Sequence, residues 1–188
     1  MTGLWISFAV VALAEMGDKT QLVALTLASR YRRPWTVMLG ILVATVLNHA
    51  LAASIGAHAA SALPRSWLAW ALGLSFIAFG FWTLVPDRAG STAAPSRWGP
   101  LLTSAAVFFV AEMGDKTQLA TLALGARFES TLAVTAGTTL GMLAADGLAV
   151  FAGERLTARV PMRVVRWLAA ALFFAFGAAA ILGRAAML

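Results

Sequence analysis

Long apolar stretches separated by short polar clusters run through the entire chain. Six of these stretches are long enough for a transmembrane helix, which needs roughly 20 mainly apolar residues to cross a hydrocarbon core of about 30 Å. They run approximately over Leu4–Ala28, Trp35–Ala59, Trp67–Val85, Leu101–Gly125, Leu132–Ala152 and Val164–Gly183. The pattern therefore predicts an all-α integral membrane protein with six transmembrane helices and almost no residues left for a soluble domain.

Composition supports this interpretation. Of 188 residues, 61% are hydrophobic and 12% are charged, and the mean hydropathy is +0.83, far above the range of soluble domains.

The chain has no cysteine, which excludes disulfides and thiolate metal ligands. We expect the first span to be retained rather than cleaved as a signal peptide, because no basic residue precedes it and it carries Glu15 and Asp18.

The basic residues gather in loops on one side of the expected membrane. A net charge of +6 would suggest a nucleic-acid partner for a soluble protein, but here the positive-inside rule explains it and no nucleic-acid partner is expected. One side receives Arg30, Arg32, Arg33, Arg88, Arg97, Arg155, Arg159, Arg163 and Arg166, and the other receives Arg65, Arg127 and Arg184. We therefore expect a multi-pass protein in the lipid bilayer with cytoplasmic first, third and fifth loops and both termini outside.

The octapeptide EMGDKTQL occurs twice, at Glu15–Leu22 and at Glu112–Leu119. A shift of 97 residues superimposes the two copies, and without any gap it also aligns Gly40 with Gly137, Pro64 with Pro161 and Trp70 with Trp167. Such a register identifies an internal repeat. Each repeat holds three spans, and because three is odd, the second copy enters the membrane from the opposite face. The prediction is two inverted three-helix repeats, residues 1–85 and 101–188, joined by a cytoplasmic linker at residues 86–100.

Both copies of the octapeptide place carboxylates deep in the bilayer. Glu15 lies about 11 residues into the first span, which is roughly 16 Å at 1.5 Å per residue. A charged side chain at that depth costs about 2.5 to 3.5 kcal/mol even on the lenient insertion scale. On a continuous helix, Glu15 and Asp18 share a face that Gln21 continues. Convergence of the two faces would create one site, with the candidate ligands Glu15, Asp18, Thr20, Gln21, Glu112, Asp115, Thr117 and Gln118.

This set of ligands is anionic and contains only oxygen donors. It suits hard divalent cations such as Ca²⁺ or Mn²⁺, and it lacks the imidazole or thiolate that favours Zn²⁺ or Cu⁺. Neighbouring carboxylates would hold protons when no cation is present, so that metal entry would release them. The chemistry therefore predicts exchange of a divalent cation against H⁺, with no cofactor.

Four further polar residues lie within the expected spans. Lys19 and Lys116 compensate charge in one of two ways: as i,i+4 partners of Glu15 and Glu112, which we favour, or as internal cations that occupy the carboxylates until the ion arrives. Asp146 and its repeat equivalent His49 are candidates for proton coupling or access, Asp146 toward the cytoplasmic half and His49 toward the outer half. His49 is equally compatible with a polar residue satisfied by a neighbouring helix.

With these features the sequence resembles a family of small membrane proteins with a duplicated Glu-x-Gly-Asp-(Lys/Arg)-(Thr/Ser) signature, which includes Golgi cation/proton exchangers and bacterial manganese exporters. Both copies match completely, over residues 15–20 and 112–117. The resemblance implies proton-coupled Mn²⁺ or Ca²⁺ transport, with the two motifs carrying the ion and no enzymatic activity. The chain lacks the extra N-terminal region and longer central loop of eukaryotic members, so it resembles the compact bacterial form, which implies Mn²⁺ efflux across the bacterial inner membrane.

Several alternatives stay open at the level of sequence. The same residues are compatible with a uniporter or channel for divalent cations, or with an exporter of a basic organic cation such as an amino acid. A remote alternative is an intramembrane aspartyl protease that uses Asp18 and Asp115. Ligand chemistry does not separate Mn²⁺ from Ca²⁺. The sequence also leaves open a homo-oligomer, the direction and stoichiometry of transport, and the continuity of the motif helices at Gly17 and Gly114.

Overall fold

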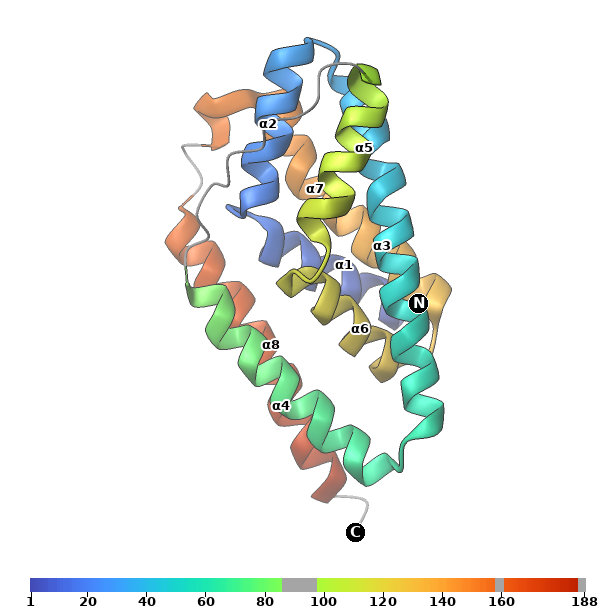
Figure 1. Cartoon of the computed structure of the whole chain (residues 1–188). Coiled ribbons are helices and arrows are strands. Elements are labelled where there is room, and N and C mark those ends of the chain that lie inside the picture. Colours follow the sequence, from blue (N-terminus) through green and yellow to red (C-terminus); the bar gives the residue numbers. More distant parts are fainter. Residues whose placement is uncertain (86–97, 158–160, 186–188) are drawn as a thin grey trace.

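The computed structural model describes residues 1–85, 98–157 and 161–185, and within these ranges it contains helices and no strand (Figure 1). The helices are α1 (Thr2–Glu15), α2 (Lys19–Tyr31), α3 (Pro34–Ala62), α4 (Arg65–Leu84), α5 (Gly99–Glu112), α6 (Lys116–Phe128), α7 (Thr131–Thr157) and α8 (Met162–Ala185). The expected all-α membrane class is confirmed. Most of the predicted linker, residues 86–97, lies outside the described residues.

Four described helices are long and apolar enough to cross a membrane, namely Pro34–Ala62, Arg65–Leu84, Thr131–Ala152 and Arg163–Gly183. They coincide with the second, third, fifth and sixth predicted spans. The first and fourth predicted spans are each divided into two shorter helices, α1 with α2 and α5 with α6. The predicted apolar stretches therefore coincide with described helices, and the structure shows that two of the stretches, whose continuity the sequence left open, are interrupted.

Each interruption falls on the glycine of the repeated motif. In the first copy α1 ends at Glu15, Met16 is extended, Gly17 has a φ of 82°, and α2 begins after Asp18. The second copy repeats this conformation, with a φ of 76° at Gly114. A residue with a Cβ is strained by roughly 1–2 kcal/mol in this left-handed region, so glycine is the residue that permits the break. The question of continuity is thereby answered: neither motif helix is continuous.

The two halves pack against each other through equivalent positions. On α3, a Cβ added to Gly40 would lie 2.6 Å from the backbone oxygen of Leu101 in α5. On α7, Gly137 makes the corresponding close approach to the backbone oxygen of Leu4 in α1. Both partners are shifted by 97 residues, so the same contact forms twice with the halves exchanged.

Helices α4 and α8 form a pair along one side of the bundle (Figure 1, green and red). Phe76 of α4 stacks on Phe173 of α8, with ring centroids 6.3 Å apart, and Phe79 packs edge-on against the same ring at 6.0 Å. Among the described residues this pair contacts α1 and α6 but makes no comparable contact with α2 and α5. The α4–α8 pair therefore covers α1 of the first interrupted stretch and α6 of the second, and it covers α2 and α5 much less.

Candidate ion-binding site

The two copies of the motif meet in the interior through two reciprocal ion pairs. Lys19 Nζ lies 2.9 Å from Asp115 Oδ2, and Lys116 Nζ lies 2.8 Å from Asp18 Oδ1. Each lysine is the first residue of α2 or α6, and each aspartate precedes the opposite helix. Residues almost a hundred positions apart therefore form one buried cluster, as the duplication led us to expect.

These partners correct the favoured interpretation of the lysines. We expected Lys19 to pair with Glu15, and Lys116 with Glu112, one helical turn away. The interruption removes the basis for that expectation, because α1 ends at Glu15 and α2 begins only at Lys19. The i,i+4 relation holds only on a continuous helix. The shared face predicted for Glu15, Asp18 and Gln21 fails for the same reason.

The two glutamates are each held by the threonine five residues later. Thr20 Oγ1 donates to Glu15 Oε2 at 2.6 Å, and Thr117 Oγ1 donates to Glu112 Oε2 at 2.8 Å. Both glutamate side chains are fully buried, and within the described chain the Oε1 atom of each has no hydrogen-bond partner. The threonine hydroxyls therefore orient the glutamates and leave one oxygen of each without a hydrogen-bond partner among the described residues.

The two glutamines support the interruptions. The Oε1 atom of Gln21 accepts a hydrogen bond from the Gly17 amide at 3.0 Å, and that of Gln118 accepts one from the Gly114 amide at 2.6 Å. Gln21 also donates from Nε2 to the Ala145 carbonyl of α7 at 2.8 Å. A backbone amide released by a helix break in a membrane needs such a partner. In this structure the glutamines therefore satisfy the backbone, and the ligand role expected for them stays a prediction.

Asp146 of α7 is a fifth carboxylate of the same cluster. Its side chain is fully buried, and neither of its oxygens has a hydrogen-bond partner among the described residues. It lies close enough to Glu15 and Asp18 for their charges to interact, and Glu112 interacts with it in turn. Asp146 therefore lies within electrostatic range of the motif carboxylates.

His49, the repeat equivalent of Asp146, is also fully buried on α3. Neither ring nitrogen has a hydrogen-bond partner within the described residues. The neighbouring Asn48 donates to the Phe109 carbonyl of α5 at 3.0 Å and so does not assist the imidazole with that amide group. The two halves thus present an imidazole and a carboxylate at equivalent positions.

The side chains of the eight predicted ligands bond to one another, to the lysines and to the backbone in this structure. Within the described residues, no group of three or more histidine, aspartate or glutamate side chains is arranged to hold a metal ion. The two aspartates face lysines, the threonines bond to the glutamates, and the glutamines bond to the backbone. The oxygen chemistry still suits a hard cation, and Glu15 and Glu112 lie within electrostatic reach of each other.

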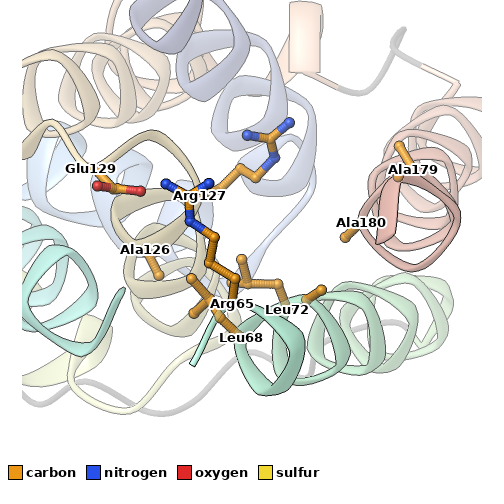
Figure 2. Close-up of a pocket in the computed structure, with 10 residues that line it drawn as sticks. Arg65, Leu68, Leu72, Ala126, Arg127, Glu129, Ala179 and Ala180 are labelled. Carbon is orange, nitrogen blue, oxygen red and sulfur yellow. The ribbon is translucent and has the colours of Figure 1, made fainter. Parts of the chain in front are cut away.

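A separate pocket of about 310 Å³ lies where α4 begins and where α6 and α8 end (Figure 2). It is lined by Arg65, Arg127 and Glu129 together with leucine, alanine and glycine residues of the three helices. Sequence reasoning used the two arginines only as topology signals and did not anticipate a pocket. The sequence pattern did not predict that Arg65 and Arg127 lie close together, because they lie on helices from different repeats.

A duplicated cluster of buried carboxylates and lysines at interrupted apolar helices is characteristic of membrane transporters for cations. The chain matches the family model described as divalent cation/proton antiporter GDT1 over residues 3–91 and 100–188, and the second segment begins and ends 97 residues after the first. The chain therefore belongs to the GDT1 family of divalent cation/proton antiporters. It is a transporter and not an enzyme, which removes the aspartyl protease alternative.

Curated relatives cover nearly the whole chain. A protein of Vibrio cholerae named "Putative manganese exporter" is 45% identical over 174 residues, which span 92% of this chain and 87% of that protein. GDT1-like protein sll0615 of Synechocystis is 29% identical, with 94% of this chain and 95% of the relative covered. GDT1-like protein 5 of Arabidopsis thaliana is 27% identical, with 97% and 96% covered. No solved structure matches the chain.

Proposed function

We propose that this protein exports Mn²⁺ across the bacterial inner membrane in exchange for H⁺. The observation that carries the proposal is the buried cluster in which both motif copies and Asp146 bring five carboxylates within electrostatic range of one another. Charged groups inside a membrane mark ion pathways because their burial is otherwise so unfavourable. The family description, a divalent cation/proton antiporter, agrees with this chemistry.

The proposed architecture is a pair of inverted repeats, residues 1–85 and 101–188, with six membrane crossings and both termini outside. The reciprocal contacts of Gly40 and Gly137 and the reciprocal lysine–aspartate pairs support it, because a two-fold relation between the halves generates such contacts in pairs. Two crossings would each consist of two short helices that meet at a glycine. In this proposed arrangement the ion site would lie between the halves, near the bilayer midplane.

Exchange follows from competition for the same oxygen atoms. Clustered carboxylates that lack a cation retain protons, because the charges of neighbouring anions repel. A divalent cation that binds there displaces those protons, and release of the cation allows protons to return. In the proposal Glu15, Asp18, Glu112 and Asp115 bind the ion. The threonines and glutamines of the motifs hold the glutamates and the interrupted backbone in place, and Asp146 adds negative charge from α7.

Mn²⁺ is proposed ahead of Ca²⁺ because the relative with 45% identity bears the name of a manganese exporter. The ligand chemistry supports both ions. Ca²⁺ takes about six to eight oxygen ligands in flexible geometry, whereas Mn²⁺ is another hard cation that carboxylate, carbonyl and water oxygens suit. The proposal is therefore sharpened by measuring the two ions in the same preparation.

The decisive experiment is ion flux into proteoliposomes with an imposed pH gradient. We expect Mn²⁺ uptake that follows the size and sign of the gradient and that dissipates it, with Ca²⁺ transported more slowly. Uptake that is insensitive to the gradient would support the uniporter or channel alternative. Inhibition by lysine but not by excess Ca²⁺ would support an exporter of basic organic cations. Glu112→Gln is the matched control, because it removes one charge and preserves the shape of the side chain.

A further inference from the structure

The two ion pairs between the motif copies put an ammonium group on carboxylates that are proposed to bind the transported cation. Lys19 contacts Asp115, and Lys116 contacts Asp18, at 2.9 and 2.8 Å. They are also the only two lysines of the chain, since the other twelve basic side chains counted with them are arginines. A lysine ammonium is a compact charge on a flexible four-carbon stem, so it can leave a carboxylate by rotation of its own side chain.

The two ion pairs differ in how enclosed they are. The side chain of Lys19 is 31% exposed and that of Asp115 4%, whereas the values for Lys116 and Asp18 are 5% and 0%. An ion that enters in this conformation therefore meets the Lys19–Asp115 pair. The Lys116–Asp18 pair is almost fully buried, in a bundle where the α4–α8 pair packs mainly against α1 and α6 among the described residues.

We propose that Lys19 and Lys116 are tethered cations that compete with the transported ion. In the ion-free protein each lysine neutralises the aspartate of the other motif copy, and binding of Mn²⁺ displaces it. In this conformation Lys19 occupies the carboxylate on the more exposed side of the site. In the opposite conformation of the transporter, in which the surroundings of the two halves are interchanged, Lys116 has this role. The proposal rests on the proposed function, because it concerns the same carboxylates.

Competition of this kind has a direct energetic basis. A buried carboxylate without a counter-charge is strongly unfavourable, and removal of one partner of a buried pair leaves that penalty in place. The lysine relieves the penalty in the ion-free protein and so raises the concentration of Mn²⁺ needed for binding. Departure of a lysine also leaves room for the ion at the aspartate that it contacted. Release is assisted in the same way, because the lysine returns to the vacated carboxylate.

The first test is modification of purified wild-type protein with a small amine-reactive reagent, followed by mass spectrometry at each lysine. Saturating Mn²⁺ should increase modification of Lys19 severalfold and that of Lys116 less, because displacement frees the ammonium from its carboxylate. Glu112→Gln is the control, since a variant that no longer binds Mn²⁺ should show no increase. Unchanged Lys19 modification in a wild-type preparation that demonstrably binds Mn²⁺ would overturn the proposal.

The second test separates affinity from turnover. Lys19→Met should bind Mn²⁺ about tenfold more tightly, a change of about 1.4 kcal/mol, and should show a lower KM together with a lower kcat. Lys19→Arg retains the charge and should restore both values toward wild type. A folded Lys19→Met variant with unchanged or weaker Mn²⁺ affinity would refute the tethered cation. Absence of proton-dependent flux in the wild type would instead refute the proposed function.

The pocket at the ends of α4, α6 and α8 is an independent feature. Figure 2 shows Arg65, Arg127 and Glu129 toward one side and Ala179 and Ala180 of α8 on the other. Within the described chain these three charged side chains form no ion pair with one another. All three lie at or next to a helix end, as expected for residues at the boundary between membrane and water.

The apolar lining of this pocket runs from the charged residues into the bundle. Leu68 and Leu72 follow Arg65 by about one and two turns of α4, and Ala180 of α8 faces the same space. The pocket therefore has two guanidinium groups and one carboxylate at the membrane boundary and an apolar groove below them. This amphipathic arrangement fits a membrane lipid with its headgroup at the surface.

We infer that the pocket binds a phospholipid whose headgroup combines a phosphate with a primary ammonium. Arg65 and Arg127 are suited to the phosphate, because a guanidinium donates two parallel hydrogen bonds to such oxygens. Glu129 then accepts the ammonium group, and the upper part of an acyl chain lies along Leu68, Leu72 and Ala180. A purely anionic headgroup would leave the Glu129 carboxylate next to further negative charge.

Lipid retention by the purified protein tests this assignment. Native mass spectrometry after exchange into micelles with phosphatidylethanolamine, phosphatidylglycerol or phosphatidylcholine should show preferential retention of phosphatidylethanolamine. Arg65→Gln with Arg127→Gln should reduce retention severalfold, and Glu129→Gln should remove the preference over phosphatidylglycerol. Arg30→Gln is the matched control, because Arg30 is the repeat equivalent of Arg127 and stacks on Tyr31 as Arg127 stacks on Phe128. Equal retention of the three lipids would overturn the assignment. Inorganic phosphate that is retained as well as phosphatidylethanolamine would also overturn it.

Discussion

The two copies of EMGDKTQL are identical in sequence and differ in their surroundings. Lys19 is about a third exposed and Lys116 is buried. A histidine lies at position 49 of the first repeat where the second repeat has Asp146. The α4–α8 pair packs against α1 and α6 and makes no comparable contact with the described parts of α2 and α5. Identical octapeptides thus lie in different surroundings in one conformation, and Lys19 is left more exposed than its repeat equivalent Lys116.

The largest expected effect comes from the motif carboxylates. Asp18→Asn, Asp115→Asn, Glu15→Gln and Glu112→Gln should each reduce Mn²⁺ flux in proteoliposomes to the background, because each removes a charge from one shared site. Membrane insertion should be retained, since neutral side chains are easier to insert. The comparison between the copies predicts equal loss in both. Near-normal flux in any one variant would show that the ion uses one copy only and would contradict the shared site.

The next effect concerns the position at which the repeats differ. Asp146→Asn should weaken Mn²⁺ binding about tenfold, or about 1.4 kcal/mol, because a buried carboxylate near Glu15 and Asp18 attracts the cation. His49→Asn should change affinity much less, because a neutral imidazole adds no charge. Equilibrium Mn²⁺ binding to purified protein measures both. Equal effects of the two substitutions would mean that α3 and α7 contribute equally, and the asymmetry of the site would then lie only in the lysines.

Much of the fold could be predicted from hydrophobic patterning, and the reason is physical. A bilayer sets a minimum length for an apolar spanning helix, so Pro34–Ala62 and Arg65–Leu84 were recognisable from their apolar runs alone. The interruption at Gly17 was not, because glycine is also tolerated within membrane helices and its φ does not follow from composition. Once the helix breaks, the i,i+4 relation fails, and with it the expected pairing of Lys19 with Glu15.

The sequence was sufficient to name the residues of the candidate site. It was not sufficient to predict which of these residues contact one another. The duplication predicted that Asp18 and Asp115 lie in one site, since in an inverted repeat equivalent residues close to the two-fold axis lie near each other. The sequence could not reveal that each aspartate faces a lysine of the opposite copy, because that pairing depends on how α2 and α6 approach each other. The pocket at Arg65 and Arg127 was equally hidden, since its walls come from both repeats.

A smaller effect, on stability, should follow from replacement of the glycine at which each motif helix is interrupted. Gly114→Ala forces a Cβ into a φ of 76°, which costs about 1–2 kcal/mol. A Cβ at this position meets no atom within 4 Å, so the loss of stability is conformational and not steric. Thermal unfolding of the purified protein measures it. Gly147→Ala on α7 is the matched control, because its Cβ would meet only Met38 Cε at 3.7 Å and alanine favours a helix. Unaltered stability in Gly114→Ala would mean that the break does not require glycine.

The smallest expected effect lies at the threonines that hold the glutamates. Thr20→Val and Thr117→Val each remove one hydrogen bond, 2.6 Å to Glu15 and 2.8 Å to Glu112. A typical hydrogen bond contributes about 0.5–1.5 kcal/mol, so Mn²⁺ affinity should fall by a factor of about two to ten. Both hydroxyls are fully buried, so equal losses are expected although the neighbouring lysines differ in exposure. Thr26→Val provides the control, because its hydroxyl bonds to the Leu22 carbonyl on the exposed face of the same helix. A loss in Thr20→Val alone would extend the asymmetry from the lysines to the glutamates, and the two copies would then differ in how they bind the ion as well as in how they are reached.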